Sequence, residues 1–190
     1  MNVFWLSESL TDNSYYHCDI HLNIMLKEAT QILSTVCYLN GHDVDFSKLY
    51  KPTHFNHPVV QWAKNPDNAL TLKFMAINLS DEFYTRTGKC HNSERVIMNL
   101  PRTFGGNIKP PFMDYCEVNM YNQTPYPILC ESNDEVIMAY RQYYRDKYYE
   151  WATREDKRKM FMKWTNREIP EFMRDLVIEY DPELKGKLIL

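Results

Sequence analysis

The feature that most constrains this chain is a regular run of apolar residues close to its amino-terminal end. Apolar side chains recur there in steps of four and three residues, at Cys18, Leu22, Met25, Ala29, Ile32, Val36 and Leu39. This spacing keeps the side chains on one face of an α-helix, whereas a strand would need a step of two. Asn40-Gly41 then supplies a typical helix end. We therefore predict an amphipathic helix over residues 14–39.

Caps, prolines and glycines predict further helices along the chain. They bound helices near residues 58–64, 66–87, 92–99, 134–162 and 171–180. Residues 2–6, NVFWL, are expected to form a short buried extended segment. The fold class is therefore predicted as mostly α, a single-domain helical bundle over residues 1–190 with a short N-terminal extended segment.

The segment 100–132 differs in character from the predicted helices. It holds five prolines and the pair Gly105-Gly106. A loop this long is uncommon in a compact domain and is often functional. We expect it to act as a lid or a partner surface, or simply to wrap the core. The tail 183–190 is expected to be peripheral.

Composition restricts the functions that the chain can have. Only 5 glycines occur among 190 residues, and neither G-x-G-x-x-G nor G-x-x-x-x-G-K-[S/T] is present, which argues against those nucleotide-binding folds. A formal charge of −3 argues mildly against a dedicated nucleic-acid binder. The five cysteines include no C-x-x-C pair, which favours reduced thiols. Without a signal peptide or a long apolar run, a cytoplasmic protein with no membrane partner is expected.

Polar residues line up beside the apolar face of the first predicted helix. His17, His21, Glu28 and Gln31 are separated by four, seven and three residues, so they lie along one line of a helix. One interpretation is a boundary stripe that hydrogen-bonds to loops. The functional interpretation is a cleft wall, with Glu28 as an acid/base or electrostatic group and the imidazoles as donors.

A second polar group occurs in THFNHP, residues 53–58. His54, Asn56 and His57 precede a helix, where they could serve as a turn and cap or face the His17/His21 stripe. The four histidines could also bind zinc in a metal-dependent hydrolase, but H-E-x-x-H is absent, and no metal site or cofactor is predicted.

The segment 140–167 mixes aromatic and cationic residues. Aromatics interleaved with Arg and Lys can stack bases and hold phosphates, whereas tyrosines on a helix often just pack. The residues that we assign to possible nucleic-acid contact are Arg141, Tyr144, Lys147, Lys163 and Arg167.

Several sequence blocks together resemble a family of small bacteriophage proteins. These blocks are YHCDIH, MLKEATQILS, YKPTHFNHPVVQW, EFYTRTGKCH, YRQYYRDK and FMKWTNREIPEFM, and they cover nearly the whole chain. Such proteins are often labelled relatives of the pyrimidine-dimer DNA glycosylases of the endonuclease V type. That more remote likeness rests on an N-terminal extended segment, a first helix with a carboxylate, and the NHP segment with Trp62.

The resemblance implies base excision followed by strand cleavage. In such enzymes an amine, the chain's own amino terminus, attacks the sugar C1′ and forms a Schiff base, while a carboxylate stabilises the sugar cation. The target nucleotide is flipped out of the stack. Glu28 becomes the leading carboxylate, with Asp19 second.

We therefore predict a DNA glycosylase/lyase-like protein that acts on or binds damaged or modified bases. The catalytic candidates are Glu28, His21, His17, Asp19 and His57. The substrate-binding candidates are His54, Asn56, Gln31, Trp62, Arg141, Tyr144, Lys147, Lys163 and Arg167. The alternatives are a non-enzymatic phage accessory protein that binds a host protein, and the metal-dependent hydrolase.

Overall fold

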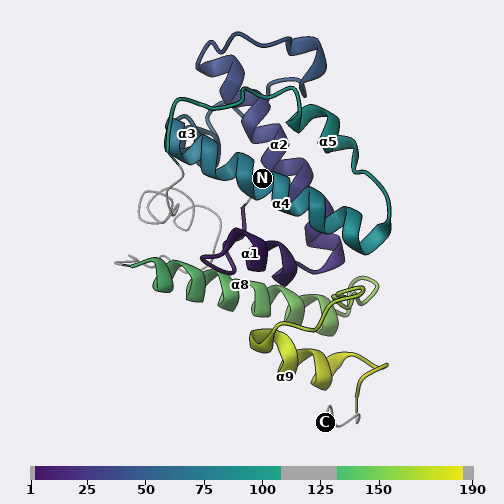
Figure 1. Cartoon of the computed structure of the whole chain (residues 1–190). Helices are drawn as coiled ribbons and strands as arrows, with labels where there is room; N and C mark the ends of the chain where they lie inside the picture. Colours follow the sequence, from purple (N-terminus) through teal and green to yellow (C-terminus); the bar gives the residue numbers. More distant parts are fainter. Residues whose placement is uncertain (1–2, 108–131, 186–190) are drawn as a thin grey trace.

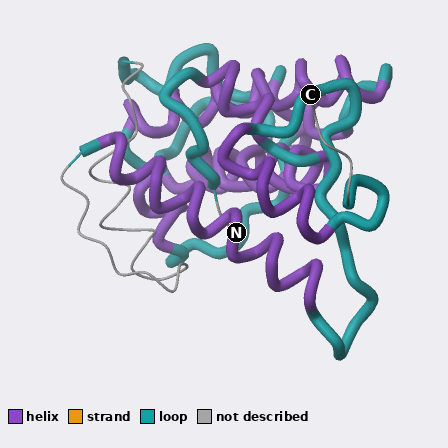
Figure 2. The backbone as a smooth tube through the Cα atoms, turned by 90° about the horizontal axis from the view of Figure 1, so that it is seen from below, coloured by secondary structure: helices purple, strands orange, loops and turns teal. Residues whose placement is uncertain are grey.

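The computed structural model describes residues 3–107 and 132–185, and within them the chain is built from helices and loops (Figure 2). The helices are α1 Leu10–Tyr16, α2 Asp19–Leu39, α3 Pro58–Ala63, α4 Pro66–Thr87, α5 Asn92–Ile97, α8 Asn133–Thr153 and α9 Glu171–Tyr180, with the 3₁₀ turn η1 Phe46–Lys48. The predicted mostly α fold is confirmed for these residues. No described helix has both the length and the apolar run that a membrane span requires.

The two long helices α2 and α4 form the most extensive helix pair (Figure 1). The short helices α3 and α5 pack against both of them, and α1 packs against α4. Figure 1 shows α1 between α4 and α8, with α9 beneath α8. The extended segment 3–6 is buried, and its residues join a single apolar cluster that reaches from Val3 to Val177.

Local caps explain most of the helix ends. The Asn65 side chain accepts from the Asp67 N–H at the start of α4, and Gly88 ends that helix in the left-handed region at φ 67°. The Ser132 side chain caps α8 in the same way. These ends depend on neighbouring residues alone, which is why the sequence predicts them well.

Two predicted boundaries are wrong. The helix expected over 14–39 is interrupted between Tyr16 and Asp19, and the helix expected over 134–162 ends at Thr153. After Thr153 the chain turns back, and the Met160 N–H donates to the Trp151 carbonyl. Most of the predicted 100–132 loop lies outside the described residues, as does the end of the 183–190 tail.

Candidate functional site

The break between α1 and α2 moves His17 off the line that the sequence predicts. His17 ends α1 in an extended conformation, and α2 begins only at Asp19. Arg86 donates to the carbonyls of Tyr15 and His17 at 2.9 Å each, and the Cys18 N–H donates to the Tyr144 hydroxyl at 2.8 Å. Backbone groups that a continuous helix would pair internally are thus satisfied by side chains distant in the sequence.

His17 and His21 lie in a buried aromatic cluster and form no cleft wall. The His17 Nδ1 lies 2.6 Å from the Asn13 carbonyl, and the His21 ring packs against Tyr144 and Trp151 with centroid separations of 4.8 and 5.1 Å. Both side chains are essentially inaccessible to solvent. The expectation that they face a substrate is therefore wrong, because aromatic packing encloses them.

Burial also fixes the charge state of the two imidazoles. It lowers the pKa of His17 from 6.5 to about 4, and it lowers the pKa of His21 well below 6.5, with the nearby His17 acting in the same direction. Both rings are neutral at pH 7. Their contribution is to packing.

Asp19 belongs to an ionic network. Its carboxylate pairs with Arg86 at 2.9 Å and accepts from the Thr165 hydroxyl at 2.7 Å. Since both contacts tie α2 to other elements, Asp19 has a structural role in this arrangement.

The centre of that network is Glu82, which sequence reasoning missed. Its side chain is 1% exposed, pairs with Arg86 at 2.6 Å, and accepts two hydrogen bonds from Arg167 at 2.8 and 2.7 Å. Burial alone would raise the pKa of Glu82, but the Arg167 and Arg86 contacts outweigh it and lower the pKa. The only sequence signal was an acidic and a basic residue four positions apart on a helix.

The predicted phosphate-binding residues are engaged in structural contacts. Arg167 also lies over the Tyr15 ring, and Arg141 donates to the Leu6 carbonyl at 2.8 Å. Lys147 lies over two aromatic rings, and Lys163 pairs with Glu183 at 3.0 Å. Tyr144 is fully buried. The four cationic side chains therefore each have a partner within the protein, and Tyr144 is inaccessible.

A different set of predicted residues remains accessible, from the middle of α2 towards its C-terminal end. Glu28 and Gln31 are half-buried, one turn apart, and Gln31 donates to the Lys51 carbonyl at 2.7 Å. One turn further, Thr35 exchanges two hydrogen bonds of 3.2 Å with the backbone of Thr53. Loop 51–57 is thus attached to the helix face that carries Glu28.

The turn that follows displays the remaining polar candidates. His54 adopts a left-handed conformation at φ 55°, and the His57 N–H donates to the His54 carbonyl at 2.8 Å. His54 and Asn56 are exposed, and His57 is half-buried. The His57 Nδ1 accepts from the Val59 N–H at 3.2 Å and caps α3. Burial and the neighbouring His54 ring lower the pKa of His57, so its imidazole is neutral at pH 7.

The two histidine pairs do not converge. The His54 turn is attached at Thr35, and His21 lies at the other end of α2, roughly 20 Å away along the helix axis. Within the described ranges 3–107 and 132–185, no three His, Cys, Asp or Glu side chains group closely enough to hold a metal ion. Trp62, a predicted substrate contact, is buried beneath this surface in α3.

Two hollows lie elsewhere on the molecule. One, of about 460 Å³, is lined mainly by Tyr15, Tyr16 and residues 166–171, and the other, of about 740 Å³, lies around Tyr50 and residues 90–98. Neither contains Glu28 or the His54 turn. The candidate site is therefore an open face made of Glu28, Gln31 and loop 51–57.

Comparisons with protein-family models, with curated proteins and with solved structures find no match for the chain.

Proposed function

We propose that this chain acts on damaged or modified bases in DNA, as glycosylase/lyase-type proteins do, with Glu28 as its functional carboxylate. The observation that supports this proposal is the attachment of loop 51–57 to the Glu28 face of α2 through Gln31 and Thr35. That attachment gathers a carboxylate, an amide and two imidazoles on an accessible face. The other first-helix carboxylate, Asp19, is committed to Arg86 and Thr165.

Each group has a part in the proposed chemistry. An amine attacks the sugar C1′, the bond from C1′ to the base breaks, and the base leaves with one of the amine's protons. The C1′–O4′ bond then opens as the second proton passes to O4′, which leaves a Schiff base between C1′ and the amine nitrogen. Glu28 would stabilise the positive charge that develops on the sugar and shuttle protons. The amine that the resemblance implies is the amino terminus, which lies outside the described residues.

His57 is suited to hold the substrate by a hydrogen bond from its ring. Its Nδ1 accepts from the Val59 N–H, so the neutral ring carries its proton on Nε2. The exposed Asn56 amide, in the same turn, can bond to a base edge or a phosphate. The turn thus offers several donors beside one carboxylate.

Strand incision tests the role of Glu28. Duplex DNA with one abasic site, UV-irradiated duplex and intact duplex are each incubated with wild-type protein, Glu28→Gln and Glu94→Gln. Glu94 is a matched control because it is also half-buried on a helix, α5, outside the proposed face. We expect cleavage of the two damaged duplexes only, a loss of about 10²–10⁴-fold in Glu28→Gln, and wild-type rates in Glu94→Gln.

Equal rates in Glu28→Gln and wild type would contradict the assignment of Glu28. Absence of cleavage of any substrate by the wild-type protein would contradict the enzymatic function itself.

A further inference from the structure

Three exposed aromatic rings gather at the end of the molecule that carries loop 51–57. Tyr38, Phe46 and Phe55 are 56%, 43% and 40% exposed. The Tyr38 ring contacts the Phe46 ring at a centroid distance of 6.0 Å and the Phe55 ring at 5.8 Å. We refer to these three residues as the aromatic platform. Their segments lie at the top of the molecule in Figure 1.

The platform is built from three separate segments that are each fixed in place. Tyr38 lies in the last turn of α2, and Phe46 begins the 3₁₀ turn η1. The Asp45 carboxylate caps that turn by accepting from the Ser47 N–H and hydroxyl at 3.1 and 2.6 Å. Phe55 is held by the attachment of Thr53 to α2. The rings are therefore preorganised on a rigid support.

Fold stability does not account for the turn that carries Phe55. His54 occupies the left-handed region, which is unfavourable for a side chain other than glycine, and Phe55 leaves a large part of its ring in water. Two locally unfavourable features thus occur at adjacent positions. Strained backbone of this kind clusters at sites that bind ligands.

The charges around the platform favour an anionic ligand. Three exposed lysines lie near it: Lys48, Lys51 and Lys64. Segment 38–64 contains these lysines and two acidic residues, Asp43 and Asp45. Its net charge is therefore +1, whereas the whole chain has a net charge of −3. The Asp45 carboxylate is paired with Ser47 and with Lys48 at 3.4 Å, so the charges of Asp45 and Lys48 offset each other, and Lys51 and Lys64 are the remaining lysines of the segment. Lys64 lies close to Tyr38, because its carbonyl accepts from the Asn40 side chain at the end of α2.

We propose that the aromatic platform stacks the bases of unpaired DNA while Lys51 and Lys64 contact the backbone phosphates. Aromatic rings with flanking cations are the recurrent means of holding single strands, since a base exposes its flat face only when it is unpaired. This inference rests on the proposed function, and it identifies locally opened or single-stranded DNA as the ligand. His54 and Asn56, which flank Phe55, join the platform to the proposed Glu28 face.

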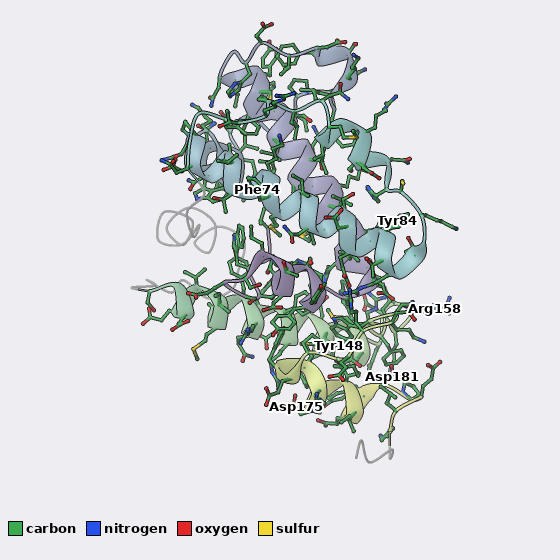
Figure 3. The ribbon with its side chains drawn as sticks, viewed as in Figure 1. Phe74, Tyr84, Tyr148, Arg158, Asp175 and Asp181 are labelled. Atoms are coloured by element: carbon green, nitrogen blue, oxygen red, sulfur yellow. The ribbon has the colours of Figure 1, made fainter. Side chains whose placement is uncertain are left out.

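Fluorescence anisotropy with a labelled oligothymidylate tests the platform, with a fully paired duplex of the same length as comparison. The variants are Tyr38→Ala, Phe55→Ala and, as matched control, Tyr84→Ala. Tyr84 is also 56% exposed but lies near the far end of α4, where Figure 3 labels it. We expect the wild-type protein to prefer the single strand, each platform variant to bind about tenfold more weakly, and Tyr84→Ala to bind normally.

The platform is a surface feature, so all variants should keep wild-type circular dichroism and melting temperature. Normal binding by both platform variants, or no binding of the single strand by the wild type, would overturn the inference. A wild-type dimer that Tyr38→Ala and Phe55→Ala dissociate, without any effect on DNA binding, would also overturn it and make the surface a protein contact. Weakened binding in the platform variants of a protein that does not cleave DNA would support the platform while refuting the proposed lyase chemistry.

Discussion

At the scale of single residues, the buried Glu82 carboxylate joins α4 to the segment before α9 and, through Arg86, to α1 and α2. It bonds to Arg86 within α4 and to Arg167 in the segment before α9, and Arg86 in turn bonds to the carbonyls that end α1 and to Asp19 in α2. A buried ion cluster of this kind is sensitive to the loss of one member, because the remaining charges stay buried without compensation.

Glu82→Gln should therefore lower the free energy of unfolding by about 3 kcal/mol or more, since it leaves Arg86 and Arg167 without their shared carboxylate. The measurement is urea unfolding followed by circular dichroism. Asp175→Asn is the matched control, because Asp175, labelled on α9 in Figure 3, forms a similar two-bond pair with Arg145 but is 66% exposed. That variant should lose less than about 1 kcal/mol. Equal losses in the two variants would contradict a special role for burial.

The buried histidines predict a dependence of stability on pH. The pKa of His17 is about 4 in the folded chain and 6.5 ordinarily, so the unfolded chain binds more protons between these values. The stability is therefore fully present above about pH 6.5 and is lost as the pH falls towards 4. From pH 7 to pH 5 His17 alone should remove about 2 kcal/mol.

Urea midpoints at pH 7 and pH 5 measure this loss. His21→Phe keeps a ring among Phe4, Tyr144 and Trp151, and it should flatten the pH dependence because it removes the second buried imidazole. Identical midpoints for the wild type at the two pH values would contradict the burial of neutral imidazoles.

Residue roles were the part that the sequence predicted least well. Asp19 and Arg167 are charged residues within distinctive sequence blocks, and the sequence predicts both as site residues. Their partners Thr165 and Glu82 lie 146 and 85 positions away in the chain. Spacing along one helix cannot identify such pairs, so the sequence predicts a catalytic role for Asp19 and no role for Glu82.

At the scale of elements, helix ends were predictable where a local cap determines them. Asn65 and Gly88 bound α4 as expected, and the Pro58 and Pro170 positions begin α3 and α9. The break at His17–Cys18 could not be predicted, since the groups that satisfy it, Arg86 and Tyr144, come from α4 and α8. The apolar periodicity begins at Cys18, so the pattern contains no signal for a break immediately before α2.

Segment 100–107 lies close against the start of α4, and this contact can be tested by substitution. A Cβ added at Gly106 would lie 2.4 Å from the Asp67 nitrogen, and the Asp67 carboxylate accepts from the Asn107 N–H at 2.6 Å. Gly106→Ala should force the segment away from α4 and lower the free energy of unfolding by about 1–3 kcal/mol. Thermal unfolding measures the effect.

Asn107→Ala is its control, because Asn107 is exposed and the bond uses only its backbone. We expect a melting temperature close to that of the wild type. An unchanged melting temperature in Gly106→Ala would show that the segment does not lie against α4 in solution.

At the scale of the whole molecule, the described chain separates a structural end from an accessible one. The ends of α1, α2 and α4 that carry His17, Asp19 and Glu82 are closed by α8 and by the segment before α9. The other end of α2 holds loop 51–57 and the aromatic platform on the surface. The sequence identified both histidine groups, His17/His21 and His54/His57, as candidates for one site. The fold shows that roughly 20 Å of α2 separates His21 from Thr35, where the His54 turn is attached.

Borohydride trapping on abasic duplex DNA tests the proposed function most directly. Borohydride reduces an imine between a protein amine and the sugar to a stable bond, and mass spectrometry of the peptides identifies the linked amine. We predict a covalent adduct with the wild-type protein, retained in Tyr84→Ala and strongly reduced in Glu28→Gln. Absence of an adduct, under conditions in which the protein is folded and binds the DNA, would contradict lyase chemistry and leave a DNA-binding protein without this activity.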